Sequence, residues 1–159
     1  MDANNYTTTN EQKALQTILL ELSDIIIDIC DRLKLRIWAG YGTLLGAVRH
    51  NGFIPWDDDM DFIMMRKDYD ILLTLIKSHS PLLQLPTNVE FDITNIRAIK
   101  LRKSDTTMHV PSWKYSKDIN AGIWLDVFAM DVAPDDLVPV ERQYEHLKRK
   151  IRICIKSKL

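Results

Sequence analysis

The chain has no long hydrophobic run and no excess of charge of one sign. Its 21 basic residues nearly balance its 22 acidic ones, which excludes a general electrostatic attraction to nucleic acid. The apolar stretch over residues 18–30 is interrupted by three acidic residues, so it lacks the composition of a membrane-spanning helix. The N-terminal residues lack the basic and apolar regions of a signal peptide, and we therefore expect a cytoplasmic protein.

Cysteine is also scarce. Cys30 and Cys154 lie far apart, and neither has the spacing of a CxxC pair or of a metal site with histidine. Free thiols in a reducing compartment are the simplest interpretation. With 159 residues, of which 46% are hydrophobic, the chain can bury one ordinary core, so we expect a single domain over residues 1–159.

Hydrophobic periodicity predicts alternating helices and strands. An apolar stripe at helical spacing predicts a first helix, capped by Asn10 and ending near Leu33. Further helices are expected over 43–49, 67–78 and 139–158, and strands over 35–39, 59–65, 89–93, 96–101 and 123–128. Residues 40–42 and 51–52 read as turns, and 113–120 as an exposed connection. This order indicates an α/β (α+β) fold with a mixed sheet flanked by helices.

Four aspartates stand within five positions, at Asp57, Asp58, Asp59 and Asp61, beside Trp56 and an apolar segment. Their mutual repulsion calls for a neutralising cation. In an extended strand, Asp59 and Asp61 would project from one face about 6.6 Å apart. That spacing can bracket the paired metal ions of phosphoryl transfer, which lie about 3.5–4 Å apart. Oxygen ligands favour Mg²⁺ or Mn²⁺ over zinc.

Two other features complete a candidate site. The turn at residues 40–43 precedes a helix whose free N–H groups and positive dipole end can hold a phosphate, with the Thr43 hydroxyl beside them. Asp126 lies in the middle of an apolar strand, where an unpaired charge would be costly. It is therefore the natural third metal ligand.

Two other interpretations of the acidic segment stay open. Runs of charge are usually solvated turns. A calcium loop would use Asp57, Asp59 and Asp61 as its first ligands, but Phe62 occupies the position of the required glycine and Asp68 that of the closing glutamate.

Two long segments resemble the LicD-type phosphotransferases, whose distant relatives include fukutin and fukutin-related protein. They are GTLLGAVRH (42–50), continuing through IPWDDDMD (54–61), and LDVFAMD (125–131), in which Ala129 replaces the usual proline. The resemblance covers about residues 35–134. It implies a nucleotidyltransferase-like fold and transfer of a phospho-alcohol, typically phosphocholine from CDP-choline. The acceptor would be a hydroxyl of a cell-surface glycan or of a teichoic acid or lipopolysaccharide precursor.

The resemblance also implies roles for individual residues. Asp59 and Asp61 would ligate the metals, and Asp126 would complete the site and act as general base. Gly42 and Thr43 would hold the donor phosphates, and CMP would leave.

Several cations and aromatic side chains are further candidates. The candidate phosphate contacts are Arg49, within the motif, and Arg97, Lys100 and Arg102. His50 either donates to a phosphate or packs under the following turn. A choline cation would find aromatic faces at Trp113, Tyr115 and Trp124, for which core or loop packing is the alternative. The basic helix at 139–158 would meet an anionic polymer or the inner membrane face, or would simply be solvated.

Two other functions fit the same motifs. One is a nucleotidyltransferase that attaches a nucleoside monophosphate to a small molecule or protein. The other is a binding protein that retains the nucleotide without turnover, because related chains commonly extend further beyond the segment around Asp126, where we expect acceptor recognition.

Overall fold

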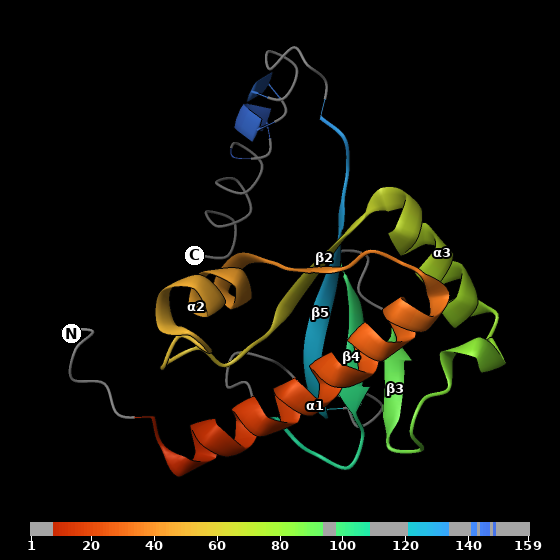
Figure 1. Cartoon of the computed structure of the whole chain (residues 1–159). Coiled ribbons are helices and arrows are strands. Elements are labelled where there is room, and N and C mark those ends of the chain that lie inside the picture. The colour runs from red at the N-terminus through yellow and green to blue at the C-terminus, as the bar shows by residue number, and fades with distance from the viewer. Residues whose placement is uncertain are drawn as a thin grey trace, which may run out of the picture.

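The computed structural model describes residues 8–93, 98–108, 121–133, 141–142, 144–146 and 148. Its helices are α1 (Asn10–Leu33), α2 (Tyr41–His50), α3 (Arg66–Lys77) and the short 3₁₀ helix η2 (Pro81–Leu83). Its strands are β1 (Trp38–Ala39), β2 (Asp61–Met65), β3 (Val89–Asp92), β4 (Ile99–Lys103) and β5 (Ile123–Met130). Figure 1 shows α1 lying across the sheet, with α2 beyond one side of it.

The five strands form one sheet in the order β1-β2-β5-β4-β3. β2 and β5 run parallel, and the other neighbouring pairs are antiparallel. This mixed sheet with helices confirms the predicted α/β class. The two motif-bearing strands, β2 and β5, are direct neighbours in the sheet, which brings together register partners, Asp61 and Asp126, that are 65 residues apart in the chain.

One face of the sheet forms the hydrophobic core with α1 and α3. The strands contribute alternate residues to it, so the residues between them point to the opposite face. The fully buried side chains of this core include Leu19, Leu22 and Ile26 of α1, Leu72 of α3, and Met64, Leu101, Leu125 and Val127 of the sheet. The opposite face receives Asp61, Lys100, Trp124 and Asp126, and burial of the apolar face therefore determines where the charged residues project.

The elements predicted up to residue 128 are present, with corrected ends. Thr9 rather than Asn10 caps α1, because Thr9 and Gln12 form a reciprocal capping box. β1 is shorter than predicted, since the chain leaves α1 through a left-handed Lys34 and only residues 38–39 pair with β2. α2 begins at Tyr41, two residues early, and β2 begins at Asp61, so Asp59 precedes the strand.

The remaining elements differ by a few residues. α3, β3, β4 and β5 lie within a few residues of the predicted ranges. The predicted connection at 113–120 lies outside the described residues, as does most of the helix predicted over 139–158. The six residues described within that range are helical. Among the helices of the described ranges, none is long and apolar enough to cross a membrane.

α2 is held close to the loop that follows it at Gly46. A Cβ at Gly46 would lie 2.6 Å from the carbonyl oxygen of Gly52 and 3.0 Å from the backbone nitrogen of Ile54. Backbone atoms cannot rotate away as a side chain can, so this position admits only glycine without a shift of the loop. Gly52 has no atom within 4 Å of the equivalent point.

We therefore expect Gly46→Ala to lower the free energy of unfolding by about 1–3 kcal/mol. Helix propensity alone predicts that the free energy of unfolding rises by about 1 kcal/mol. The sign of the measured change therefore shows whether the steric effect or helix propensity dominates. Urea unfolding followed by circular dichroism measures it. Gly52→Ala is the matched control and should change stability little; equal behaviour of the two variants would contradict the close approach.

Candidate functional site

The backbone of Asp61 joins α2 to the sheet. Its N–H donates to the Thr43 hydroxyl oxygen at 2.8 Å, and its carbonyl accepts from the Gly40 N–H at 2.9 Å. Both partners belong to the turn that starts α2. Thr43 was predicted to hold phosphate, and the structure shows a second role for its hydroxyl, which fixes the first turn of α2 beside the acidic segment.

Asp61 and Asp126 face each other across the parallel pair. They are register partners on β2 and β5, and the Asp126 N–H donates to the Met60 carbonyl at 3.0 Å. Adjacent strands lie about 4.8 Å apart, so two carboxylates predicted from distant segments become neighbours. Burial, together with the negative charges of Asp59, Asp126 and Asp57, raises the pKa of Asp61 to about 6 against an opposing effect of Lys100.

Asp59 lies with Asp57 and Asp58 in the segment before β2. Each of the three offers a carboxylate oxygen within 4.8 Å of the others. Burial first, and then the charges of neighbouring aspartates, raise the pKa of both Asp57 and Asp59. The strand predicted to begin at Asp59 begins instead at Asp61, so Asp59 lies just before it, and the spacing predicted for the two carboxylates stays a prediction. The charge of Asp59 nevertheless raises the pKa of Asp61.

Lys100 is the cation nearest to Asp126 in the described structure. Its Nζ lies 2.6 and 2.8 Å from the two carboxylate oxygens of Asp126, and both side chains are largely buried. The antiparallel register of β4 and β5 produces this pair, since Lys100 is directly opposite Asp126. Lys100 was predicted as a phosphate contact, and in the structure it neutralises a carboxylate.

Trp124 connects the same carboxylate to a second cation. Its indole N–H donates to Asp126 at 3.0 Å, and its ring lies 4.6 Å from Lys100 Nζ and 4.8 Å from the Arg102 guanidinium. Arg102 is buried and also binds Asp92 and the Gly122 carbonyl. The predicted use of Trp124 for choline stays a prediction, and the structure already gives its ring two cationic partners.

Gly42 allows the start of α2 to approach the acidic segment. A Cβ at Gly42 would lie 2.7 Å from Asp57 Oδ2. The helix N-terminus predicted to hold phosphate therefore already has a carboxylate beside it. Gly42, Thr43 and Asp57 also line a cavity of about 360 Å³, whose other walls come from α1, α2 and the loop before β2.

Arg49 and His50 lie at the opposite end of α2. Arg49 is exposed, and its Nε donates to His50 Nε2 at 3.0 Å. The His50 ring contacts Trp56 edge-on, with centroids 6.3 Å apart. This contact is with Trp56 and not with the following turn, so the two predicted roles of His50 stay predictions.

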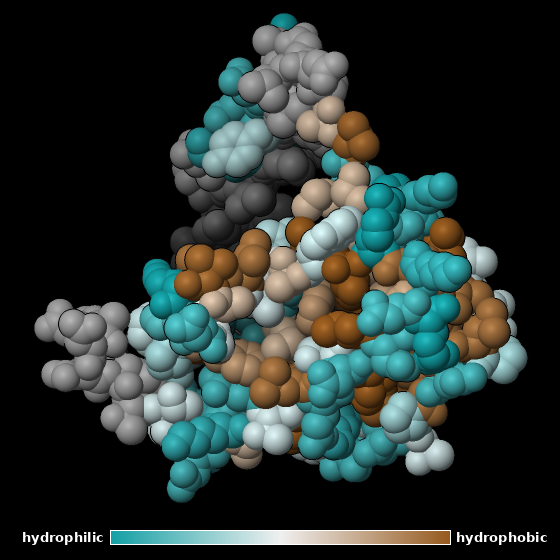
Figure 2. Space-filling view, viewed as in Figure 1, coloured by the Kyte–Doolittle hydropathy of each residue, from teal (hydrophilic) through white to brown (hydrophobic). Residues whose placement is uncertain are grey.

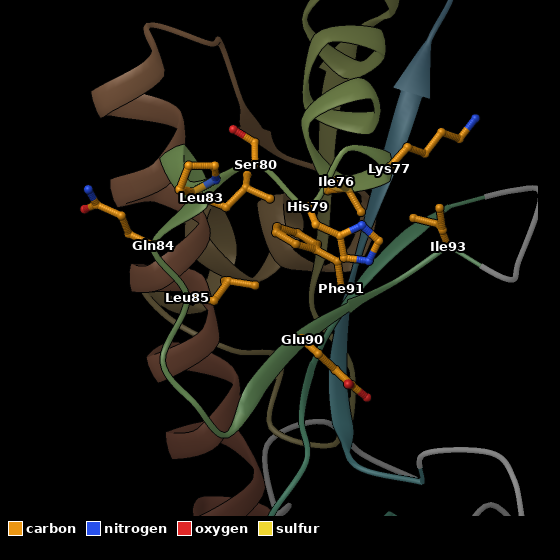
Figure 3. A pocket seen from close by; sticks show the side chains of 11 residues that line it. Ile76, Lys77, His79, Ser80, Leu83, Gln84, Leu85, Glu90, Phe91 and Ile93 are labelled. Carbon is orange, nitrogen blue, oxygen red and sulfur yellow. The ribbon is translucent and has the colours of Figure 1, made fainter.

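A larger cavity lies elsewhere. It measures about 620 Å³ between the end of α3, η2 and β3, and its lining includes Ile76, Leu83 and Phe91. Figure 3 shows these apolar side chains around His79, while Lys77 and Glu90 extend away. None of the predicted site residues lines it. We place the candidate site at the carboxylates because charge and hydrogen bonding converge there.

Some predicted residues lie outside the described ranges, namely Arg97, Trp113 and Tyr115. Conversely, the sequence interpretation assigned no role to Asp57 beyond the calcium alternative, although the structure places it against α2 and next to Asp59. The density of four aspartates in five positions was the available signal.

We expect Lys100→Met, measured in EDTA, to destabilise the protein more at pH 8 than at pH 5. Removing the ammonium takes away the charge that neutralises Asp126 and raises the pKa of Asp61 further above its unfolded value. A carboxyl with a raised folded pKa destabilises the fold only where it must ionise, so the penalty grows as the pH rises through the folded pKa. At pH 8 the loss should be about 3 kcal/mol, typical of a broken buried pair.

Lys103→Met provides the control for this experiment. Lys103 lies on the same strand and pairs with the more exposed Glu21, so its loss should cost less than about 1 kcal/mol. Thermal unfolding at both pH values measures both variants. An equal penalty for Lys100→Met at pH 5 and pH 8 would contradict the assigned role of the lysine.

Comparison with known proteins matches these motifs to one family. The family described as LicD/FKTN/FKRP, nucleotidyltransferase domain, matches residues 34–150. Lipopolysaccharide cholinephosphotransferase LicD of Haemophilus influenzae is 26% identical over 144 residues, which are 89% of this chain and 53% of that protein. The chain thus spans about half of that relative's length. Human ribitol 5-phosphate transferase FKRP is 36% identical over 50 residues, covering 31% of this chain and 10% of FKRP. Because the family match covers most of the chain and contains the assembled carboxylates, the protein belongs to the LicD/FKTN/FKRP family.

Proposed function

We propose that this protein is a metal-dependent transferase that moves phosphocholine from CDP-choline to a hydroxyl of a cell-surface glycan, or of a teichoic acid or lipopolysaccharide precursor. The two relatives named above transfer different phospho-alcohols, one choline phosphate and the other ribitol phosphate. Transfer of a phospho-alcohol is the activity that the two names have in common, and the first of them also names a lipopolysaccharide. Choline is the more specific choice because the relative with the wider coverage acts on it.

The juxtaposition of Asp61 and Asp126 carries the proposal. Four carboxylates, those of Asp57, Asp59, Asp61 and Asp126, interact electrostatically, and the pKa of Asp61 is raised to about 6 by burial and by the other three charges. A cation would relieve this repulsion. The donor set consists of oxygens, which suits Mg²⁺ or Mn²⁺. Asp59, Asp61 and Asp126 would hold the metal, which would supply electrostatic stabilisation of the phosphate oxygens.

The chain's own residues then act on donor and acceptor. The free N–H groups at the start of α2 and the Thr43 hydroxyl orient the donor diphosphate. The acceptor hydroxyl oxygen forms a bond to the phosphorus that carries choline, and the bond from that phosphorus to the CMP oxygen breaks. Asp126 accepts the hydroxyl proton, and CMP leaves with the electron pair of the broken bond. Lys100 and Trp124 orient Asp126 through the hydrogen bonds observed.

The cavity beside α2 suits part of the donor. Its volume of about 360 Å³ is enclosed mainly by apolar side chains with the Asp57 carboxylate at one wall. A trimethylammonium group combines an apolar surface with a positive charge, and this lining matches both properties. We place the acceptor side of the reaction at the inner membrane face, where the basic residues of the predicted C-terminal helix would meet anionic polymer or lipid.

Calorimetric titration with CDP-choline tests the donor site. We expect binding in Mg²⁺ and none in EDTA. Asp59→Asn combined with Asp61→Asn should weaken it at least about tenfold, equivalent to 1.4 kcal/mol, because the cation that links protein and diphosphate is lost. Asp24→Asn, on the exposed face of α1, is the matched control and should bind normally.

Product analysis with a glycan acceptor tests the reaction. Release of free CMP with choline phosphate on the acceptor is the expected result. Attachment of CMP to the acceptor would instead show a nucleotidyltransferase, and binding without CMP release would show a nucleotide-binding protein. Absence of CDP-choline binding by the folded protein would overturn the choice of donor.

A further inference from the structure

α2 turns an apolar stripe toward solvent. Tyr41, Leu44, Leu45 and Val48 are 67%, 49%, 46% and 77% exposed. Their spacing places all four on one side of the helix, the pattern that usually faces a core. Figure 2 shows a hydrophobic area over α2 on the visible face of the molecule. Large exposed stripes of this kind mark interaction surfaces.

The two ends of α2 carry opposite charge. At its start, Gly42 adjoins the carboxylate of Asp57, which belongs to the acidic segment. At its end stand Arg49 and His50, joined by a hydrogen bond. The helix dipole adds a positive start and a negative end, but the formal charges of the flanking side chains exceed the half-charges of the dipole.

Gly42 and Arg49 lie on the same edge of the apolar stripe. They are seven residues apart, which is close to two full helical turns. A twofold axis can pair two copies of α2 so that the helices run antiparallel. The edges that carry Gly42 and Arg49 then lie on the same side of the interface in both copies. The axis would pass between Leu44 and Leu45, at the centre of the stripe. It would bring Arg49 of one copy to the edge of the other α2 that carries Gly42, about 3 Å beyond Gly42 along the helix, at the level of residue 40.

We propose that a second copy of this chain covers the stripe through antiparallel packing of α2 on α2, and that the partner's Arg49 reaches the start of α2 beside Asp57. The packing buries the same four apolar side chains from each copy, as an isologous interface requires. Each acidic segment meets the cationic end of the other helix. Both the apolar surface and the charge pattern of α2 are therefore self-complementary.

A second copy fits this surface better than an anionic bilayer does. Asp57, Asp58 and Asp59 lie close together at the start of α2. Negatively charged lipid would be repelled from that end of the stripe, whereas a second copy presents a guanidinium there. A partner with a wholly apolar surface would offer no charged group to the acidic start or to the basic end of α2.

The arrangement gives Arg49 a function that it lacks within its own chain. Seven helical residues separate it from Gly42 by about 10 Å along the axis, and its Nε is bound to His50. The partner's Arg49 would instead stand beside the helix N-terminus that holds the donor diphosphate, where a fixed guanidinium stabilises developing charge. This assignment to the diphosphate rests on the proposed function, whereas the dimer itself does not.

Sedimentation and site-specific oxidation test the dimer directly. The natural protein should sediment as a dimer at micromolar concentration, and Val48→Glu should sediment as a monomer with an unchanged melting temperature. Ile71→Glu is the control, since Ile71 is a comparably exposed apolar residue on α3, and it should remain dimeric. A monomeric natural protein, or vesicle binding that Val48→Glu abolishes without any dimer, would overturn the proposal.

Cysteine cross-linking locates the axis. In a Cys154→Ser background, Leu45→Cys should form a symmetric disulfide, because the axis passes within one residue of it. Val48→Cys should not, since the two copies of Val48 would be separated by about 10 Å along the helices, beyond the reach of a disulfide. Cys30 is buried, and burial raises the pKa of its thiol to about 12, so it will not compete. Efficient linkage at residue 48 rather than 45 would exclude antiparallel packing.

Mixing two inactive variants tests the contribution of Arg49. Arg49→Ala and Asp61→Asn should each lose CMP release, and their mixture should regain about a quarter of natural sites, because half of the dimers contain one intact site. A dimer without recovery would overturn the role of Arg49 and leave the interface standing. If the natural protein itself fails to bind CDP-choline, the proposed function fails, while the cross-linking result still decides the dimer.

Discussion

Repulsion among carboxylates is the constraint around which this molecule is organised. Asp61 and Asp126 lie side by side on adjacent strands, and burial together with the charges of Asp59, Asp126 and Asp57 raises the pKa of Asp61 to about 6. One buried lysine, Lys100, offsets part of this charge through Asp126. A fold that concentrates negative charge in this way sacrifices stability, and such sites are retained where a bound cation or substrate supplies the compensation.

The burial of the opposite sheet face makes that concentration possible. Because strand residues alternate, packing Leu125 and Val127 against α1 forces Trp124 and Asp126 to the other face. The same alternation on β4 places Lys100 and Arg102 beside them. The hydrophobic core therefore positions the polar site, although we assign no core residue to the reaction. The backbone of Asp61, bonded to Thr43 and Gly40, extends this positioning to α2.

α2 has two faces with different tasks. Its inner side meets the backbone of the following loop so closely at Gly46 that glycine is required there, and Gly42 lies against the Asp57 carboxylate. Its outer side carries the exposed stripe that we assign to a second copy. If both hold, the helix joins the donor site of one chain to the interface with the next, and assembly and catalysis share a single ten-residue element.

The sequence by itself determined the α/β class, the approximate helices and strands, and the membership of Asp59, Asp61 and Asp126 in one motif-bearing set, because periodicity and motif spacing are local properties. Only the tertiary structure decided strand order and register. The strand register makes Asp126 the neighbour of Asp61, and it places Lys100 opposite Asp126, where the two side chains form an ion pair. The tertiary structure also shows that Asp59 lies before the strand and that Asp57 lies against α2. The ends of strands depend on partners that are distant in the chain, and local sequence patterns do not specify these partners.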